Sequence, residues 1–246
     1  DKFNEHLSAK GIVFACSMYN IQHTVTPVNG KLQVKLECER PDVEIRYTMD
    51  GKEPTDRSLL YKSPLMVTGT QTIKCTTYRA GRQMGKTLTL PLVWNKATAK
   101  PVLGNTQAGK ILVNGIRGSL RQSDFEWHSW ESSDSVAFTI DLQKKESLRS
   151  VSVGCITNYG MAAHKPADIE VWVSNDNRDY RKVSGKLFTD GEIFREGTFK
   201  EDVVLDLNKE IGRYVRIIAK GAGECPATHV RPGQEARIYF DEVMIE

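Results

Sequence analysis

Apolar and polar residues alternate with a period of two in residues 31–39, where Leu32, Val34, Leu36 and Cys38 fall on one side. Residues 43–49 repeat the pattern, and Asp50-Gly51 follows as a hairpin-type turn. Alternation of this kind puts one face of a strand in water and the other in a core. It predicts a set of antiparallel strands that ends near Trp94, at residues 31–39, 43–49, 72–78 and 88–94.

Strand patterns resume after a polar stretch at residues 95–102, which we interpret as a linker. The predicted strands are residues 136–142, 148–155, 169–173, 203–207, 214–219 and 238–245. Long loops are expected at 114–135, 156–166 and 220–235, and a rigid sandwich usually binds its ligands through such loops. The fold class is therefore all-β, with two β-sandwiches.

The domain boundaries follow from these patterns, with sandwiches expected at residues 21–97 and 98–246. Residues 1–20 begin with Phe3 and Leu7 at helical spacing, and Gly11 is a plausible helix stop. We interpret them as the tail of an upstream domain. The chain starts at Asp1, so we expect it to be a piece of a longer protein.

Charge and hydropathy exclude two classes of partner. The 34 Lys and Arg residues and 31 Asp and Glu residues are interspersed, and the net charge is only +3. A nucleic-acid-binding surface would need a basic stripe, so we expect no nucleic-acid partner. No apolar run approaches the ~18–20 residues of a membrane span, so none is expected.

Candidate chemistry is sparse in the sequence. The five Cys residues are widely spaced without a C-x-x-C pair, so a zinc site is not expected, and Cys38 and Cys155 are predicted to be buried in strands. The His residues are scattered without ligand spacing. Asp241 and Glu242 lie in a terminal strand, where neighbouring side chains point to opposite faces, so they should not form a catalytic pair. No catalytic residue is predicted.

Residues 45–61 (IRYTMDGKEPTDRSLLY), Pro64 and the strand Thr72-Ile73-Lys74-Cys75 have a specific appearance. They resemble the immunoglobulin-like domain that follows the catalytic barrel in bacterial β-N-acetylhexosaminidases and chitobiases, which are glycoside hydrolases of family 20. The resemblance implies an immunoglobulin-like sandwich here and a catalytic barrel upstream. The barrel's Asp-Glu pair would lie outside this chain, because nothing here alternates strand and helix.

The second half carries another ordered set of motifs: Leu112-Val113-Asn114-Gly115, Trp127, Trp130, Ile140-Asp141-Leu142, Arg213-Tyr214-Val215-Arg216 and Phe240-Asp241-Glu242-Val243. They resemble a discoidin, or coagulation factor V/VIII C-type, domain, a group that includes carbohydrate-binding module family 32. The resemblance implies a galactose-binding-like jelly roll that follows the immunoglobulin-like domain. Two positions depart from the family pattern. Asn114 replaces the usual Asp, and Gln143 replaces the usual Gly.

The discoidin resemblance implies a sugar site on the loops, because a sugar is bound by an aromatic ring under its C–H face and by polar groups at its rim. The candidates are Trp127, His128, Trp130, Tyr159, His164 and Arg231, of which Trp127 is favoured as a loop anchor in the core. The expected partners are glycans with terminal N-acetylhexosamine or galactose. The resemblance also implies structural calcium, with Asn114, Ser119 and Glu242 at the matching positions, although Asn114 lacks the charge of Asp.

The function expected from both resemblances is that of a non-catalytic, carbohydrate-binding region of a β-N-acetylhexosaminidase. Such an enzyme would be secreted, periplasmic or on the surface of a bacterium. Two alternatives stay open. The domains could only pack against the parent enzyme, or they could adhere to a protein or cell surface through apolar side chains ringed by basic ones. The loop at 124–134 has apolar side chains, but its charges are mostly acidic.

Overall fold

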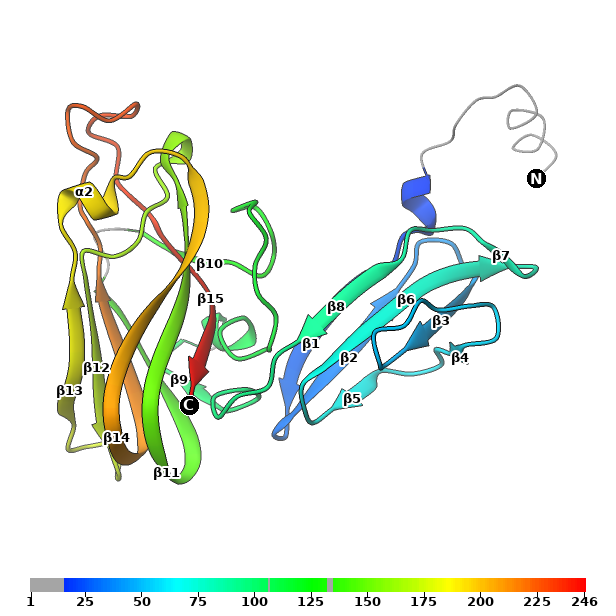
Figure 1. The fold of residues 1–246 in the computed structure, drawn as a ribbon, viewed down its shortest axis with the longest axis horizontal. Coiled ribbons are helices and arrows are strands. Elements are labelled where there is room, and N and C mark those ends of the chain that lie inside the picture. The colour runs from blue at the N-terminus through cyan, green and yellow to red at the C-terminus, as the bar shows by residue number, and fades with distance from the viewer. Residues whose placement is uncertain (1–15, 106, 132–134) are drawn as a thin grey trace. The chain divides into compact units, whose positions relative to one another are not determined.

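The computed structural model describes residues 16–105, 107–131 and 135–246, and strands dominate them (Figure 1). They divide into two compact units: residues 16–25 with 33–92, and residues 93–246 with 26–32. The predicted all-β class is confirmed. Within these ranges, every helix is too short to cross a membrane. The helix expected at residues 1–10 lies outside the described residues.

Two small sheets make up the first unit, and only the ends of β1 and β2 at residues 26–32 are grouped with the second unit. One has the strand order β1-β2-β5, and the other has the order β4-β3-β6-β7 with β8 also paired to β6. The elements are η1 (Cys16–Tyr19), β1 (Gln22–Val28), β2 (Lys31–Glu37), β3 (Glu44–Thr48), β4 (Leu59–Leu60), β5 (Leu65–Val67), β6 (Gln71–Arg79), β7 (Arg82–Gln83) and β8 (Leu88–Leu92).

The alternation of β2 has its expected effect. Leu32, Val34 and Leu36 are buried and the residues between them are not. Cys38 is an exception to the prediction, because it lies beyond the end of β2 and is only partly buried, with its thiol directed at the carbonyl of Met18 at 3.4 Å. Four Cys residues can be described, and all are free thiols.

The second unit has ten elements. They are β9 (Val102–Leu103), η2 (Ala108–Lys110), β10 (His128–Trp130), β11 (Ser135–Asn158), η3 (Tyr159–Met161), β12 (Asp168–Ser174), β13 (Arg181–Leu187), α2 (Asp190–Ile193), β14 (Thr198–Lys220) and β15 (Ile238–Ile245). The strand order is β10-β15-β11-β14-β12-β13, with β9 added to β11.

The long strands β11 and β14 build both layers of this sandwich. The first half of β11 pairs with the second half of β14, and their remaining halves pair with each other across a register shift between Asp141 and Glu146. Residues from both halves, such as Phe138 and Val153, belong to one buried core. The sequence predicted four separate strands here, whereas the structure joins them into two that fold over the core.

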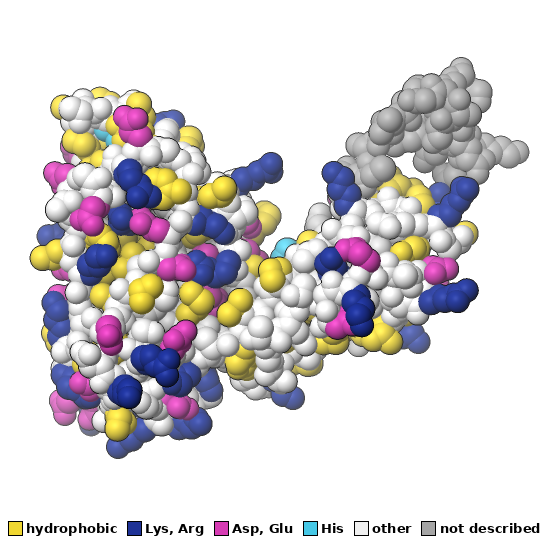
Figure 2. All heavy atoms as spheres, in the orientation of Figure 1, with side chains coloured by type: hydrophobic (Ala, Val, Ile, Leu, Met, Phe, Trp, Pro, Cys, Tyr) yellow, Lys and Arg dark blue, Asp and Glu magenta, His cyan; other side chains and the backbone are white. Residues whose placement is uncertain are grey.

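The surface agrees with the charge pattern. On the face shown in Figure 2, basic and acidic side chains are intermixed over both units. Many of them form ion pairs along or across the strands, for example Arg46 with Glu44 and Lys182 with Glu170. This face carries no continuous basic stripe.

Candidate functional site

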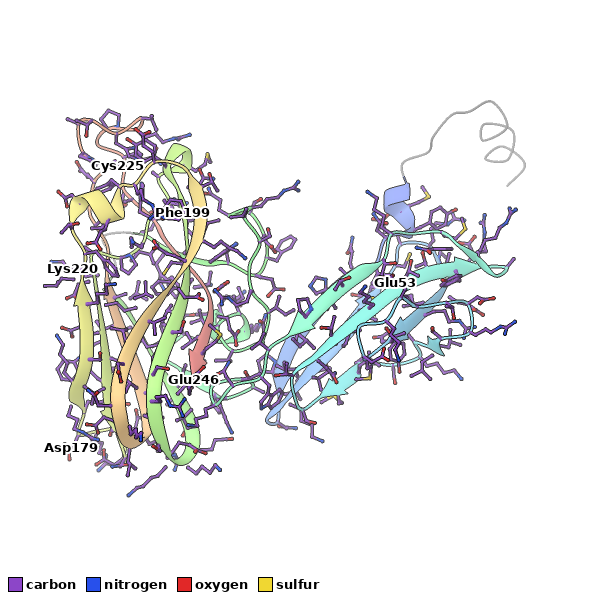
Figure 3. The ribbon with its side chains drawn as sticks, viewed as in Figure 1. Glu53, Asp179, Phe199, Lys220, Cys225 and Glu246 are labelled. Carbon is purple, nitrogen blue, oxygen red and sulfur yellow. The ribbon has the colours of Figure 1, made fainter. Side chains whose placement is uncertain are left out.

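Among the residues that the structure describes, three loops leave the second unit at one end of the sandwich, which we call the loop end. β11 finishes at Asn158, opposite the first residue of β14, and β12 begins at Asp168, opposite the last residue of β14. The converging loops are residues 159–167, 188–197 and 221–237. Figure 3 shows Cys225 in this group of loops and Asp179 at the opposite end. The predicted ligand loops at 156–166 and 220–235 therefore lie together.

Two buried histidines hold these loops together. His164 is 1% exposed and His229 is 4% exposed, and their Nε2 atoms lie 3.2 Å apart. Nδ1 of His164 lies 3.0 Å from the carbonyl of Ile193, to which only an N–H can donate. Nδ1 of His229 accepts the backbone N–H of Arg231 at 3.0 Å. These partners define the tautomers, so that the Nε2–H of His229 donates to Nε2 of His164.

Burial keeps this pair neutral. Desolvation lowers the pKa of His164 to about 4 and lowers that of His229. Aromatic rings surround the imidazoles, with Tyr159 at 3.9 Å from the His229 ring and Phe194 at 5.0 Å from the His164 ring, centroid to centroid. The loop end therefore has an uncharged, aromatic interior.

Cys225 completes this interior. Its thiol, one ring nitrogen of His164 and one ring nitrogen of His229 all lie within 4.8 Å of one another. The residue is buried next to Ala162 and Ala236, and burial raises the pKa of its thiol. The sequence shows no ligand spacing for these residues, because His164 is more than 60 positions before Cys225 and His229. The one available signal was the presence of Cys225 and His229 in the same loop.

Tyr159 and Arg231 lie at the surface above the pair. Arg231 is exposed, and its guanidinium donates to the Gly160 carbonyl at 2.5 Å, to Met161 Sδ at 3.6 Å and to Gln234 Oε1 at 3.2 Å. Tyr159 is half-buried, with its hydroxyl 3.5 Å from the carbonyl of Thr228. Both predicted contacts thus share one surface, whereas His164 lies beneath it.

The remaining aromatic candidates pack inward. Trp127 is 6% exposed, and its indole N–H donates to the Ser119 carbonyl at 3.0 Å. Trp130 packs on Phe138 and Phe240 with centroid distances of 6.3 and 5.4 Å, and His128 meets its edge at 4.4 Å. Burial lowers the pKa of His128. These rings support the loop from below.

The 114–135 loop also carries an exposed aromatic ring. Phe125 is 93% exposed, and Leu120 in the same loop is 56% exposed. The residues that anchor the loop are Trp127 and Gly118, where a Cβ would lie 2.3 Å from the Trp127 ring. Anchoring from below leaves the Phe125 ring free to face solvent.

A second polar cluster lies where β15 meets the 114–119 segment. Asp241 and Glu242 are both fully buried, although the sequence predicted that they would face opposite ways. The register shift between Val153 and Cys155, where β11 pairs with β15, is the reason, because it breaks the alternation at these two residues. Each carboxyl has a different set of partners.

These partners differ in charge. Asp241 binds Arg117 at 2.9 Å and the Gly118 N–H at 3.0 Å. Glu242 accepts the Gly115 N–H at 3.0 Å through Oε2, while its Oε1 has no hydrogen-bond partner. Burial raises the pKa of Glu242 well above its usual value. The cluster thus holds one carboxyl that is not neutralised by a basic side chain.

The three predicted calcium ligands can be compared with this cluster. Asn114 Oδ1 accepts the Ile116 N–H at 2.9 Å, and Ser119 Oγ accepts the Arg121 N–H at 3.2 Å, so each keeps one lone pair. Glu242 Oε1 is the buried orphan oxygen. All three side chains carry oxygen, the kind of donor that a hard cation such as calcium prefers, and Ser119 is the exposed one of the three.

Comparison with known proteins yields two family models. The model of the chitobiase/beta-hexosaminidase C-terminal domain matches residues 26–89, and the model of the F5/8 type C domain matches residues 96–231, which is more than half of the chain. No curated protein matches the sequence.

The solved structures that match share little sequence with this chain. A Clostridium perfringens domain in complex with GalNAc-β-1,3-galactose is 16% identical, with 55% of this chain and 83% of that one covered and a TM-score of 0.34. Chitosan-binding module 1 of a Paenibacillus chitosanase/glucanase is 14% identical, with 62% of this chain and 98% of that one covered and a TM-score of 0.39. The C-terminal domain of a Bacteroides fragilis chitobiase is 14% identical, with 53% of this chain and 76% of that one covered and a TM-score of 0.31.

Proposed function

The chain belongs to the F5/8 type C domain family, and we propose that its second unit binds carbohydrate at the loop end of the sandwich. The observation that carries this proposal is the shared surface of Tyr159 and Arg231. Both residues come from loops that the strands β11, β12 and β14 bring to one place. A rigid sandwich that presents loops in this way supports specific binding.

The chemistry of the two side chains suits a neutral sugar. The Tyr159 ring packs on the buried His229, so its position is set before a ligand arrives. Arg231 is held by three loop acceptors, and a guanidinium has more N–H donors than these contacts use. The remaining donors can bind ring hydroxyls or the oxygen of an acetamido group. The sugars expected are terminal N-acetylhexosamine or galactose.

The family match of the first unit supports a role for this binding function beside an enzyme. Residues 26–89 match the chitobiase/beta-hexosaminidase C-terminal domain. The chain then acts as a non-catalytic accessory region of a β-N-acetylhexosaminidase whose catalytic barrel lies upstream. That enzyme is secreted, periplasmic or on the surface of a bacterium, where it meets glycans. The purely structural alternative predicts no sugar binding at all.

Structural calcium belongs to the same proposal. Asn114, Ser119 and Glu242 supply oxygen atoms, and the ion would compensate the buried charge of Glu242. It would stabilise the 114–119 segment against β15, some distance in sequence from the sugar contacts.

Titration calorimetry of the 246-residue chain with N-acetylglucosamine, N-acetylgalactosamine and galactose tests the proposal. We expect millimolar affinity for at least one sugar and a loss of at least about tenfold in Tyr159→Ala and in Arg231→Ala. Tyr180→Ala and Arg178→Ala are matched controls and should bind like the unchanged protein, because both residues adjoin Asp179 in the sequence, which Figure 3 shows at the opposite end of the sandwich. Absence of binding to all three sugars at millimolar concentration would overturn it.

A further inference from the structure

We propose that His164, Cys225 and His229 form a binding site for a thiophilic divalent cation of the zinc class. The inference rests on the convergence of three buried donors from two loops, and it does not depend on sugar binding at the surface. In the metal-free protein the two imidazoles share a hydrogen bond. The cation would take the place of the proton between them.

The donor separations suit a tetrahedral ion. Zn–N bonds of roughly 2.0–2.1 Å and Zn–S bonds of roughly 2.3 Å put the nitrogen and sulfur donors about 3.3–3.6 Å apart. The Nε2 atoms of His164 and His229 are 3.2 Å apart. The thiol lies within 4.8 Å of a ring nitrogen of each histidine, so it has at most about 1.2 Å to close to reach the tetrahedral distance.

The ligand atoms select the class of ion. One thiolate and two imidazole nitrogens form a soft to borderline set that favours zinc over calcium or magnesium, which prefer oxygen. The three residues are buried among Ala162, Phe194 and Ala236, so no carboxylate takes part in the described cluster. The three ligands leave one position of a tetrahedral ion for water.

His164 is already prepared to act as a ligand. Its Nδ1–H donates to the Ile193 carbonyl, which orients the ring and leaves the Nε2 lone pair directed at the other donors. Metal-bound histidines usually have a backbone or carboxylate partner of this kind at the second nitrogen. In this tautomer Nε2 of His164 carries no proton, so none has to be removed from it before a cation binds.

On metal binding, Cys225 must lose a proton and His229 must move one from one ring nitrogen to the other. Cys225 loses its thiol proton to solvent when the S–metal bond forms. The proton on Nε2 of His229 moves to Nδ1, and the hydrogen bond from the Arg231 N–H is given up. The balance is one proton released per ion bound, without oxidation or reduction. The titratable and charged groups that face the site are Tyr159, over the His229 ring, and Arg231, whose charge acts on both Cys225 and His229.

Cobalt(II) is a suitable probe, because a tetrahedral site with a thiolate gives visible d–d bands and a sulfur-to-cobalt charge-transfer band. We expect one Co²⁺ per chain, displacement by Zn²⁺, and release of about one proton per Zn²⁺ at pH 7. Cys225→Ser should remove the charge-transfer band and weaken Zn²⁺ binding at least tenfold. Cys38→Ser removes the partly exposed thiol of the first unit and should change neither result.

A second measurement covers the case in which Cys225→Ser does not fold. Zn²⁺ should protect Cys225, but not Cys38, from alkylation in the unchanged protein, as mapped by mass spectrometry of peptides. The amide signal of Arg231 should shift on metal binding, because its hydrogen bond to His229 is lost. No saturable cobalt spectrum, a charge-transfer band that survives in folded Cys225→Ser, or equal alkylation with and without Zn²⁺ would each overturn the proposal.

Discussion

The carboxylate of Asp241 occupies the space that a side chain on Gly154 would need. A Cβ built on Gly154 would lie 1.9 Å from Oδ1 of Asp241 and 2.6 Å from a guanidinium nitrogen of Arg117. Gly154 lies at the register shift between β11 and β15, where the carboxyl turns into the sandwich. Because Gly154 has no side chain, the ion pair of Arg117 with the buried Asp241 can form at this position.

Gly154→Ala should destabilise the second unit by about 2–3 kcal/mol, because the new methyl group overpacks the site and displaces the Asp241 carboxylate from Arg117. Urea unfolding followed by tryptophan fluorescence measures the change. Gly191→Ala is the matched control, since a Cβ there meets no atom within 4 Å, and its stability should change by less than about 0.5 kcal/mol. Equal effects of the two substitutions would contradict this account.

Arg117 should contribute more than a surface ion pair does. Its guanidinium bonds both Asp202 and the fully buried Asp241, so Arg117→Met leaves a buried charge unpaired and should cost about 3 kcal/mol. Arg181→Met breaks the exposed pair with Glu210 and should cost about 0–1 kcal/mol.

A double variant separates the lost charge from the lost packing. Arg117→Met combined with Asp241→Asn removes both charges of the pair, including the buried one, so it should be more stable than Arg117→Met alone. The comparison uses the free energy of unfolding at pH 7. If the double variant is the less stable of the two, the cost of the single substitution does not come from an uncompensated carboxylate.

Asp141 should make part of the stability depend on acid pH. Arg213 donates to both its oxygens at 2.7 and 2.9 Å, and this hydrogen bonding lowers the pKa of Asp141 from its usual 3.8. A carboxyl with a lowered folded pKa stabilises fully above its unfolded pKa and loses that contribution as the pH falls through the folded value. Because the Arg213 side chain is 38% exposed, about 1 kcal/mol is expected at neutral pH.

Asp141→Asn measures this contribution. The unfolding free energies of the variant and the unchanged protein should differ by about 1 kcal/mol at pH 7 and converge as the pH falls below 3.8. Asp179→Asn, a surface change at the same end of the sandwich, should cost less than about 0.5 kcal/mol at every pH tested. A difference that grows toward acid pH would have the wrong sign for this pair.

The alternating pattern predicted most of the fold because burial of one face imposes it physically. Leu32, Val34 and Leu36 are all buried, as are the inward positions of β15 such as Val243 and Ile245. β13 was not predicted, since it is an edge strand whose residues are mostly exposed and polar. An exposed edge leaves little apolar signal in the sequence.

Some departures from the family pattern became interpretable only with the backbone. Gln143 replaces the usual Gly, and the structure gives it a φ of 68°, in the left-handed region that glycine adopts without cost. Asp141 accepts the Gln143 N–H at 2.8 Å and so supports this conformation. The sequence flagged the position, but not the reason for it.

The candidate site was predicted in part. Tyr159 and Arg231 were named from their loops, and the structure brings them together. The contact of His164 with His229 depends on how β11, β12 and β14 return to one end of the sandwich, and no spacing along the chain reports it. Contacts that depend on pairing between strands far apart in the chain are the hardest to predict from the sequence.

Calcium should stabilise the second unit through Glu242. The carboxyl is buried with one oxygen unpartnered, and its pKa is raised by burial, so without a cation it favours the neutral form. Calcium at about 100 times its Kd should add about 2.7 kcal/mol, or roughly 5–10 °C in melting temperature, and a chelator should reverse this.

In Glu242→Gln the neutral amide replaces the neutral acid, so the melting temperature of the variant should equal that of the chelated protein and should not change with calcium. Glu210→Gln, at the surface, should keep the full response. Equal melting temperatures of the unchanged protein in calcium and in chelator would show that a proton, rather than calcium, compensates Glu242.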